Sequence, residues 1–414
     1  MSIYNTAIIG GGASGILSAI QLNDKNSILL EKNEILGKKI LLTGGGRCNL
    51  TNNSSLEEYM NSFYNSGKFY RNAFTFFFNK DIINMLERNG CKTKIEENNR
   101  VFPTSDKSKS VQETLINILN KKDTCYKLNA DVKSVSKKKN HFIIHYNNST
   151  IKSKYVILAT GGKAYPKTGS TGDGYNFAKE FGHSISTNRA GLSPLKIEEK
   201  WIQSLQGISI ECKLEIKANN KSIKKDEGSI IFTHNGISGP VILNNSMNIN
   251  KHLRKNHVVV VNLDLCKNKS YESLEKVMID DFKDNANKSI KNYLSKYLPK
   301  RMSRYFLDNI GIDSEKTLNQ ITKKERVTLR DSLKRLTLTV SEVIEKESFV
   351  TNSGVKRKEI DPTTFESKIV ENLFIVGELI DGCGISGGYN LQQAYSTGVL
   401  ASKTINERLN NDLS

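Results

Sequence analysis

The first thirty-one residues alternate short apolar runs with a glycine-rich turn. An apolar run at residues 6–9 precedes residues 10–15, which contain four glycines, and residues 16–22 carry apolar side chains in a helical pattern. A second apolar run at residues 27–30 ends in Glu31. This order of strand, glycine turn, helix and strand predicts a βαβ unit at the start of the chain.

The next part of the chain predicts helices followed by strands. Residues 59–120 predict mainly helix, and their aromatic-rich part at residues 59–78 is more typical of a core than of a substrate pocket. Residues 125–160 predict strands. They close at residues 155–159 with a continuous apolar run, which is typical of a strand buried in a parallel sheet.

The pattern then changes twice before it returns to strand. Alternating and β-branched stretches predict a β-rich module, and a charged stretch with helical spacing follows it. The strands predicted in this second half are residues 208–216, 229–232, 258–265, 336–340, 349–350 and 372–376, and the last predicted helix is residues 391–409. Lysine-rich stretches at residues 137–139 and 219–225 are interpreted as solvated hairpin ends.

Three glycines of the first turn fit the spacing of a dinucleotide-binding loop. Gly10 allows the tight turn, Gly12 lets the backbone approach a pyrophosphate, and Gly15 lets the helix pack closely on the strand. The helix that follows offers free N–H groups and a positive dipole end. Glu31 stands at the end of the second strand, 21 residues after Gly10, where a carboxylate can accept both ribose hydroxyls.

Nucleotide-binding signals at both ends of the chain predict one α/β, Rossmann-like domain that carries an insertion. The predicted segments are residues 1–187 and 351–414 for the two parts of this domain, residues 188–265 with a return strand at 335–350 for the β-rich insertion, and residues 266–334 for a helical module nested within it.

Two later segments favour FAD over NAD as the dinucleotide. The strand at residues 155–162 ends in small residues, which would let the chain pass close to a bound cofactor. The strand at residues 372–378 ends in glycine and glutamate, placed to hydrogen-bond a polyol such as ribitol, which a nicotinamide dinucleotide lacks. Each segment alone is unremarkable, but in this order they predict FAD.

A glycine-rich loop at residues 381–394 opens the last helix. A helix N-terminus there could face the pyrimidine side of an isoalloxazine ring and stabilise the negative charge of the reduced flavin. The structural alternative is a glycine turn that merely caps the terminal helix.

Several of these motifs together resemble the BaiN/YhiN-like flavoproteins, which are bacterial proteins labelled NAD(P)/FAD-dependent oxidoreductases or aminoacetone-oxidase-type proteins. The resemblance runs from about residue 4 to residue 401, and its most specific block is Thr-Gly-Gly-Gly-Arg-Cys-Asn within residues 37–52. The other matching blocks are residues 100–103, 232–240, 377–381 and 387–392.

The resemblance implies an FAD domain of the two-dinucleotide-binding-domain type, with an inserted β-barrel-like module and a nested helical module. It leaves the substrate undefined, although one branch of the family resembles bile-acid 4,6-ene reductases. Residues 351–355 depart from it, because they read Thr-Asn-Ser-Gly-Val where the family has Thr-x-Gly-Gly-Val, so a substrate-side loop is expected to differ.

The cofactor contacts can be set out as one prediction. We predict that a non-covalent FAD contacts Gly10, Gly12, Ala13, Ser14, Gly15, Glu31, Lys32, Lys39, Thr43, Gly44, Gly45, Arg47, Asn49, Val132, Ala159, Thr160, Gly161, Gly377, Glu378, Gly388, Asn390 and Leu391. No residue is singled out as a covalent flavin attachment.

Four further side chains each carry a functional and a structural interpretation. Arg47 could bind an anionic substrate or the flavin, or only form a loop salt bridge. Tyr389 could donate a proton or stack near the flavin, or only pack beneath it. Cys48 follows Arg47, whose charge could activate the thiol, but packing is the alternative. His234 could be a general acid or a turn residue.

Composition and charge narrow the class of protein. The chain has 414 residues, a formal net charge of +18 and a pI near 9.4. Over-use of Asn, Ile and Lys along the whole chain explains this charge without a specific nucleic-acid partner. Six scattered cysteines, no metal-ligand cluster, no secretory signal and no apolar stretch of membrane-spanning length predict a cytoplasmic, metal-free, globular protein.

These features predict an FAD-dependent oxidoreductase that transfers hydride between flavin N5 and a small organic substrate, as an enone-type reductase would. A single glycine motif of this kind implies that NAD(P)H, if it is the donor, binds transiently. Two alternatives stay open. One is an RNA-acting flavoprotein, similar to tRNA-uridine-modifying enzymes, and the other is a non-catalytic flavin sensor. The sequence leaves the oligomeric state open.

Overall fold

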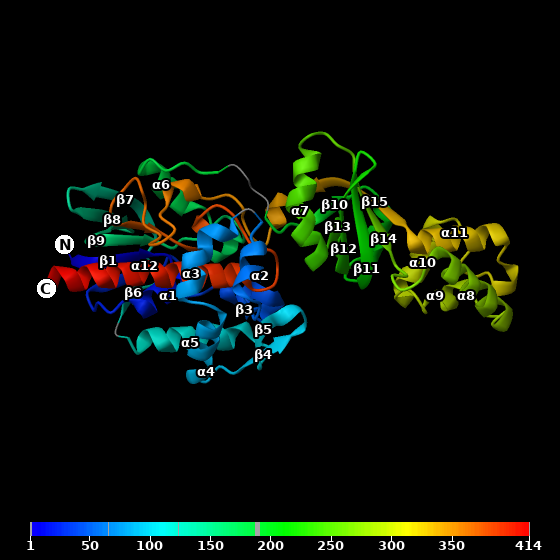
Figure 1. Ribbon diagram of the computed structural model, residues 1–414, viewed down its shortest axis with the longest axis horizontal. Coiled ribbons are helices and arrows are strands. Elements are labelled where there is room, and N and C mark those ends of the chain that lie inside the picture. The colour runs from blue at the N-terminus through cyan, green and yellow to red at the C-terminus, as the bar shows by residue number, and fades with distance from the viewer. Residues whose placement is uncertain (1, 65, 123, 187–190, 414) are drawn as a thin grey trace. The chain divides into compact units, whose positions relative to one another are not determined.

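The computed structural model describes residues 2–64, 66–122, 124–186 and 191–413 (Figure 1). The chain forms two compact units. Unit 1 comprises residues 1–191 and 348–414, and unit 2 comprises residues 192–347. The predicted domain boundary between residues 187 and 188 lies outside the described residues, and the finer division of the chain into segments stays a prediction.

Unit 1 is built on a central seven-stranded sheet. β1 (Ile3–Ile9) pairs in parallel with β2 (Ser27–Leu30) on one side and with β9 (Ser149–Leu158) on the other. The strand order is β6-β2-β1-β9-β8-β7, with β16 also paired to β9, where these strands are β6 (Cys125–Lys127), β7 (Val132–Lys138), β8 (His141–Tyr146) and β16 (Leu373–Ile375). The predicted βαβ unit and Rossmann-like α/β class are confirmed.

Strand β9 shows how both ends of the chain enter one sheet. Its first residues pair antiparallel with β8, whereas Val156, Ile157 and Leu158 pair in parallel with both β1 and β16. Both edges of this stretch are therefore occupied, and its last four residues are buried. This confirms the interpretation of the apolar run as a buried parallel strand.

Helices α1 (Ala13–Gln21) and α12 (Tyr389–Leu413) pack against each other (Figure 1). A Cβ atom on Gly398 would lie 2.5 Å from the carbonyl oxygen of Ser14, so the two backbones approach closely. The hydroxyl of Ser18 donates to the carbonyl of Gly398, and Ser402 donates to the carbonyl of Ser18. The first and last helices of unit 1 are therefore joined directly.

The aromatic-rich part of unit 1 is core, as expected. Tyr59, Phe63 and Phe74 are fully buried, and their rings pack on one another and on neighbouring aromatic side chains. They belong to a helical layer that comprises α2 (Leu56–Asn61), α3 (Arg71–Phe76) and α4 (Asn79–Arg88), and α5 (Ser108–Asn120) follows further along.

The prediction of mainly helix across residues 59–120 is wrong at one place. β4 (Thr93–Glu96) and β5 (Arg100–Pro103) form an antiparallel hairpin, and β3 (Thr51–Asn52) pairs with β5. The hairpin turns through Asn98 and Asn99, whose φ angles of 59° and 57° lie in the left-handed region that asparagine tolerates. The two consecutive asparagines were the sequence signal for this turn. The strands on either side have only four residues each, which is too short for their own pattern to indicate a hairpin.

Unit 2 contains a closed six-stranded barrel, which confirms the β-barrel-like insertion. The strands run in the order β10-β13-β12-β11-β14-β15 around the ring, with β10 (Leu195–Ile197), β11 (Ser209–Ala218), β12 (Lys221–Phe232), β13 (Gly236–Ser238), β14 (Val259–Asp264) and β15 (Leu336–Val343). Helix α7 (Pro240–Leu253) packs on β12. Along β11, buried and more exposed residues alternate, because every second side chain faces the barrel interior.

The helical module lies between β14 and β15, so it is nested in the barrel as predicted. It consists of α8 (Tyr271–Asp284), α9 (Ile290–Leu294), α10 (Lys300–Asn309) and α11 (Lys323–Lys334). No helix among the described residues is both long enough and apolar enough to cross a membrane.

The predicted strand at residues 349–350 is wrong. Phe349 and Val350 lie in a bend that follows a 3-10 turn (Glu345–Glu347), and both residues line a cavity of unit 1 instead of joining a sheet. Two consecutive apolar residues are too short a pattern to separate a strand from a cavity wall.

Candidate functional site

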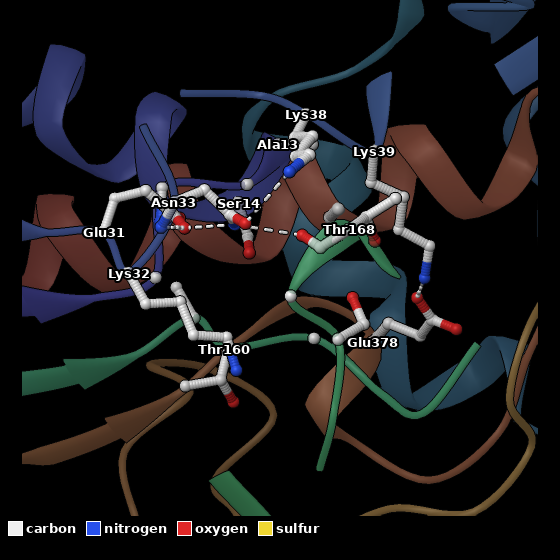
Figure 2. Close-up of a pocket in the computed structure, with 18 of the residues that line it drawn as sticks. Ala13, Ser14, Glu31, Lys32, Asn33, Lys38, Lys39, Thr160, Thr168 and Glu378 are labelled. Carbon is white, nitrogen blue, oxygen red and sulfur yellow. Dashed lines mark hydrogen bonds and ion pairs between the residues drawn. The ribbon is translucent and has the colours of Figure 1, made fainter. Parts of the chain in front are cut away.

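A deep cavity in unit 1 opens at the carboxyl ends of β1, β2 and β9 (Figure 2). Open α/β sheets bind ligands at this edge. The cavity holds about 1190 Å³ of empty space, part of which is open to solvent. The predicted cofactor residues that line it are Gly10, Gly12, Ala13, Ser14, Glu31, Lys32, Lys39, Thr43, Val132, Ala159, Thr160, Gly161, Glu378, Asn390 and Leu391.

The three glycines of the first turn occupy different surroundings. A Cβ atom on Gly15 would lie 1.9 Å from the carbonyl oxygen of Gly10, so only glycine fits where α1 crosses β1. Gly10 has a φ of 103°, which glycine adopts readily. Gly12 has an ordinary φ of −79°, and a Cβ atom there would meet nothing within 4 Å. Its backbone therefore borders the open space of the cavity.

The start of α1 is suited to an anion. The helix has no side-chain cap and no acidic residue in its first turn, so its N–H groups and the positive end of its dipole face the cavity. Lys38 and Lys39 also line the cavity. A pyrophosphate group fits such a helix N-terminus.

Glu31 is buried at the end of β2 and already holds the local backbone. Its Oε2 accepts a hydrogen bond from the N–H of Gly11 at 2.7 Å, and its Oε1 accepts from the backbone and side chain of Asn33 at 2.8 and 2.6 Å. The carboxylate thus braces the glycine turn. Each of its oxygens has more than one acceptor site, so it can also accept from a ribose hydroxyl.

On the other side of the cavity, Lys39 and Glu378 point towards each other (Figure 2). Lys39 Nζ lies 2.6 Å from Glu378 Oε2, and Glu378 Oε1 accepts from the N–H of Thr351 at 2.8 Å. The side chain of Glu378 is 18% exposed. The predicted acidic residue after β16 therefore lies in the cavity and is held by groups from two other segments of the chain.

Lys32 forms a second ion pair at the cavity wall, at 2.6 Å from Asp173 in the first turn of α6 (Asp173–Glu180). Burial alone would raise the pKa of Asp173, but hydrogen bonds from Lys32 and Thr171 outweigh it and hold this pKa below its usual value. Asp173 is therefore ionised at neutral pH and fixes Lys32 in place.

Thr160 leaves an unpaired polar group at the cavity. Its Oγ1 is buried and has no hydrogen-bond partner among the described residues. A Cβ atom on Gly174 would lie 2.0 Å from this oxygen, so the hydroxyl packs against the start of α6 and is covered by protein. The helix N-terminus and Glu31 are therefore the groups of this wall that fit a dinucleotide.

The glycine-rich loop before α12 is held by three asparagine side chains. Asn390 accepts from the N–H of Gly384 at 2.8 Å and donates back to its carbonyl at 3.0 Å. Asn52 donates to the carbonyl of Gly387 at 3.0 Å. With its amide oriented to satisfy both neighbours, Asn49 accepts from the N–H of Gly388 at 3.2 Å. The loop is a rigid connection between the 43–52 block and α12.

Several predicted cofactor contacts lie outside the cavity lining, namely Gly15, Gly44, Gly45, Arg47, Asn49, Gly377 and Gly388, and the catalytic candidate Tyr389 also lies outside it. A Cβ atom on Gly388 would lie 2.4 Å from the backbone of Thr51, so this glycine serves packing between the loop and β3. A larger residue at Gly388 would disturb that packing before it reached a ligand.

Arg47 and Tyr389 are the two predicted catalytic residues, and the structure places both in structural contacts. Arg47 forms ion pairs with Glu96 and Asp106 and lies 4.2 Å above the ring of Phe102. These partners, with Glu96 first, raise the pKa of Arg47 further above its usual value. The ring of Tyr389 packs edge-on against Tyr59 at 4.7 Å. The ion pairs of Arg47 and the ring packing of Tyr389 correspond to the structural interpretation of each residue.

Cys48 and His234 also lie in positions that fit their structural interpretations, which are packing for Cys48 and a turn for His234. Cys48 is fully buried, and burial raises the pKa of its thiol to about 12, although a hydrogen bond with Thr43 opposes the shift. A thiol with such a pKa is not activated by its neighbour Arg47. His234 is exposed in the turn between β12 and β13 of unit 2.

We expect native Cys48 to resist alkylation by iodoacetamide at pH 8, where a pKa near 12 leaves roughly one thiol in ten thousand as thiolate. Cys125 is exposed and should react. Peptide mass spectrometry after timed quenching measures both sites, and alkylation in 6 M guanidinium chloride is the control in which both should react. Equal rates in the native protein would contradict the burial of Cys48.

Sequence reasoning missed one segment of the site. Thr168, Gly169, Ser170 and Asp173 line the cavity between β9 and α6. The signal was available in the Gly-Ser-Thr-Gly-Asp-Gly run at residues 169–174, which places glycines where a strand passes into a helix. The described residues contain no group of three or more His, Cys, Asp or Glu side chains that could hold a metal ion.

The chain matches a known protein family and several known proteins. A family model described as "HI0933-like protein Rossmann domain" matches residues 4–404. The chain is 30% identical over 409 residues to the 3-dehydro-bile acid delta(4,6)-reductase of Clostridium scindens, covering 97% of this chain and 98% of that protein.

Two further relatives carry a different name. The ribosomal RNA dihydrouridine synthase of Escherichia coli is 28% identical over 405 residues, covering 96% of each chain. The protein of the same name from Haemophilus influenzae is 29% identical over 419 residues, covering 99% of this chain and 100% of that protein.

Solved structures share the fold at low identity. A flavocytochrome c3 fumarate reductase in its open conformation matches with a TM-score of 0.53 at 16% identity, over 98% of this chain and 78% of that chain. The 3-ketosteroid-delta4-(5alpha)-dehydrogenase of Rhodococcus jostii RHA1 matches with a TM-score of 0.52 at 12% identity, over 98% of this chain and 97% of that chain.

Proposed function

From the premise that the chain belongs to the HI0933-like protein family with a Rossmann domain, we propose that it is an FAD-dependent oxidoreductase. Its proposed reaction is hydride transfer to a carbon–carbon double bond conjugated with a carbonyl group in a small organic substrate. The observation that carries the proposal is the cavity of unit 1, which is lined by a bare helix N-terminus, Glu31 and the Lys39–Glu378 ion pair.

The residues of the cavity divide the work of holding the cofactor. The N–H groups at the start of α1 and Lys38 would hold the pyrophosphate. Glu31 would accept the adenosine ribose hydroxyls, which FMN lacks. Glu378, oriented by Lys39, would accept from the ribitol hydroxyls. Bound flavin would supply a centre that accepts and donates hydride.

The names of the relatives support one bond type. A 3-dehydro delta(4,6) substrate carries double bonds conjugated with a carbonyl, and the C5=C6 bond of uridine is conjugated with its C4 carbonyl. We propose the small-molecule enone as the substrate class and NADH or NADPH as a transiently bound donor. Uridine in RNA is the second candidate, because two relatives carry that name and the chain has a net charge of +18.

The functional test uses purified protein under anaerobic conditions. We expect a yellow protein whose flavin absorbance bleaches with NADH or NADPH and returns when a 3-oxo-4,6-diene steroid is added. A ribosomal RNA transcript, assayed for dihydrouridine by mass spectrometry, tests the second candidate. Flavin that no nicotinamide reduces and no acceptor reoxidises would leave the sensor alternative in place of both.

We expect heat denaturation to release FAD and not FMN, and the substitution Glu31→Ala to weaken FAD binding about ten- to a hundredfold. The reason is the loss of a charged hydrogen-bond acceptor, which is worth about 1.5–3 kcal/mol. Glu34→Ala is the matched control, since Glu34 is exposed three residues away and does not line the cavity. Chromatography identifies the released flavin, and fluorescence titration of the apoprotein measures affinity. Release of FMN, or equal affinity in both variants, would contradict the assignment of Glu31.

A further inference from the structure

One exposed face of the helical module carries cations and an aromatic ring together. On α10, Lys300, Arg301, Arg304 and Tyr305 are exposed, whereas Met302, Ser303, Phe306 and Leu307 are buried in the module. The pairs 300/304, 301/304 and 301/305 are three or four residues apart, so these positions neighbour one another on the helix surface. The 3-10 turn η5 (Lys200–Leu205) packs beside α10 and adds the exposed Lys200 and the half-buried Trp201.

The cations of this face are not engaged in ion pairs with any described residue. Within the described part of the chain, none of Lys200, Lys300, Arg301 and Arg304 lies within 4.0 Å of a carboxylate oxygen. Arg301 donates to the backbone carbonyls of Ser204 at 2.8 Å and Gln206 at 2.9 Å, which fixes its guanidinium without neutralising it.

The acidic groups near this face are few. Asp308 lies one turn along α10 from Arg304 and is exposed. Glu315 interacts electrostatically with Arg304, but it is paired with Lys291 at 2.8 Å. Glu198 and Glu199 directly precede Lys200, and Glu199 accepts from the N–H of Thr339, so the cations of this face outnumber the two remaining carboxylates, Glu198 and Asp308.

Helix α11 of the same module is also rich in cations, but most of them are paired. Arg326 and Arg330 are paired with Glu275, and Lys334 is paired with Asp264, whereas Lys323 and Lys324 are exposed at the start of the helix. The net charge of the chain therefore does not show where cations without a carboxylate partner are displayed. Within the residues that the structure describes, all three cations of α10 are of this kind.

Tyr305 and Trp201 indicate which class of molecule this face can bind. Tyr305 is 36% exposed between the cations of α10. No exposed side chain of α10 or η5 is aliphatic, as a membrane-inserting face would require. Exposed aromatic rings among arginines and lysines are the combination that binds unpaired bases and phosphates of RNA.

We propose that this face, formed by Lys200 and Trp201 of η5 with Lys300, Arg301, Arg304 and Tyr305 of α10, binds RNA. The cations would contact phosphates, and Tyr305 would stack on an unpaired base. This inference rests on the second candidate function, RNA as the carrier of the uridine substrate. It assigns the helical module the role of docking that RNA, separately from the cofactor cavity of unit 1.

The test compares two double charge reversals in the full-length flavoprotein. Lys300→Glu with Arg304→Glu changes the proposed face, and Lys323→Glu with Lys324→Glu makes the same change in charge at two exposed positions of α11. The probe is a fluorescein-labelled, unmodified ribosomal RNA transcript. We expect the α10 variant to bind about tenfold more weakly and its salt dependence, the slope of log K against log salt, to fall by about 2. The α11 variant should change little.

Tyr305→Ala separates stacking from charge. It should weaken RNA binding about tenfold without changing the salt slope, and Tyr305→Phe should restore binding. Flavin content and reduction of a small enone should be unchanged in all of these variants, since none lies in the cavity.

The outcomes separate this inference from the function of the cavity. Equal RNA binding by the α10 and α11 variants would overturn the proposed face, even if the protein reduces uridine. A wild-type protein that binds no RNA above 0.1 M salt would overturn both the face and the second candidate, and leave the small-molecule reductase standing. Binding to phosphatidylglycerol vesicles in place of RNA would also overturn it.

Discussion

Replacing Gly12 with aspartate is expected to abolish FAD binding while leaving unit 1 at least as stable as before. Gly12 is the N-cap residue of α1, with φ −79° and ψ −168°, a conformation that any L-residue adopts. A Cβ atom there meets nothing within 4 Å, so the substitution introduces no clash within the protein. An aspartate would cap a helix that now lacks a side-chain cap, and we expect a gain of about 0.5–1.5 kcal/mol in the free energy of unfolding.

The same carboxylate would stand where the pyrophosphate is proposed to lie. Like charges at one site repel, and the helix N-terminus that would hold the phosphates would be occupied by the aspartate. We expect FAD affinity to fall at least about a hundredfold, which corresponds to about 2.7 kcal/mol. Fluorescence titration of the apoprotein measures the affinity, and thermal unfolding of the apoprotein measures the stability.

Two other glycine positions supply the controls. Gly12→Ser caps the helix without a charge, and should keep the stability gain and lose less affinity. Gly15→Ala should lower the free energy of unfolding, whereas Gly12→Asp should raise it. The reason is that the Cβ atom of an alanine at position 15 would lie 1.9 Å from the carbonyl oxygen of Gly10. FAD affinity at the wild-type level in Gly12→Asp would show that the pyrophosphate lies elsewhere.

Thr351→Val is expected to lower the free energy of unfolding of unit 1 by about 2–4 kcal/mol. Thr351 is 5% exposed, and its Oγ1 accepts hydrogen bonds from the N–H groups of Lys163 at 2.9 Å and Ala164 at 3.0 Å. Valine has nearly the same shape but no acceptor, so the N–H of Ala164 would lose its partner in a buried place and the N–H of Lys163 in a half-buried one. Each unsatisfied group costs about 1–3 kcal/mol.

Thr351→Ser is the matched control, because it keeps the hydroxyl and removes only a methyl group. Urea unfolding followed by far-UV circular dichroism gives the midpoints, and hydrogen exchange of the peptide that contains residues 162–165 reports the local effect. Faster exchange should be seen in the valine variant and not in the serine variant. Unchanged exchange in both would show that Thr351 does not hold this segment.

Local sequence patterns predicted the structure correctly where a residue's role depends on residues close to it in the chain. The βαβ unit at the start of the chain, with Gly10, Gly15 and Glu31 in their predicted places, is an example, since its contacts span about twenty residues. The strand at residues 229–232 was predicted too short, because β12 begins at Lys221. Its first half is polar on both faces and is kept in the barrel by pairing with β11, which no local pattern reveals.

Contacts between distant segments could not be predicted from one sequence. Lys39 and Glu378 were both named as cofactor residues, yet nothing in the chain indicates that they pair across 339 positions. His183 is buried between Glu359 and Ser367, with hydrogen bonds of 3.2 and 2.8 Å, and none of the three was singled out. Arg47 lies in the most specific motif, but its partner Glu96 comes from a hairpin within a region predicted as mainly helix, and Asp106 comes from the loop between β5 and α5. A side chain's motif indicates its importance, whereas its partners depend on topology.

Unit 1 is built from two separate stretches of the chain, so its parts become available for folding at different times during translation. Unit 2 is encoded as one uninterrupted stretch, residues 192–347, so all strands of its barrel leave the ribosome before β16 and α12 exist. Translation is vectorial, and domains generally fold as they emerge. Until the last helix is synthesised, β9 lacks its partner β16, α1 lacks the helix that covers it, and Lys39 lacks Glu378. The face of α1 that α12 covers therefore stays open for most of synthesis, and the cavity gains Glu378 and its last lining residues only near the end of the chain.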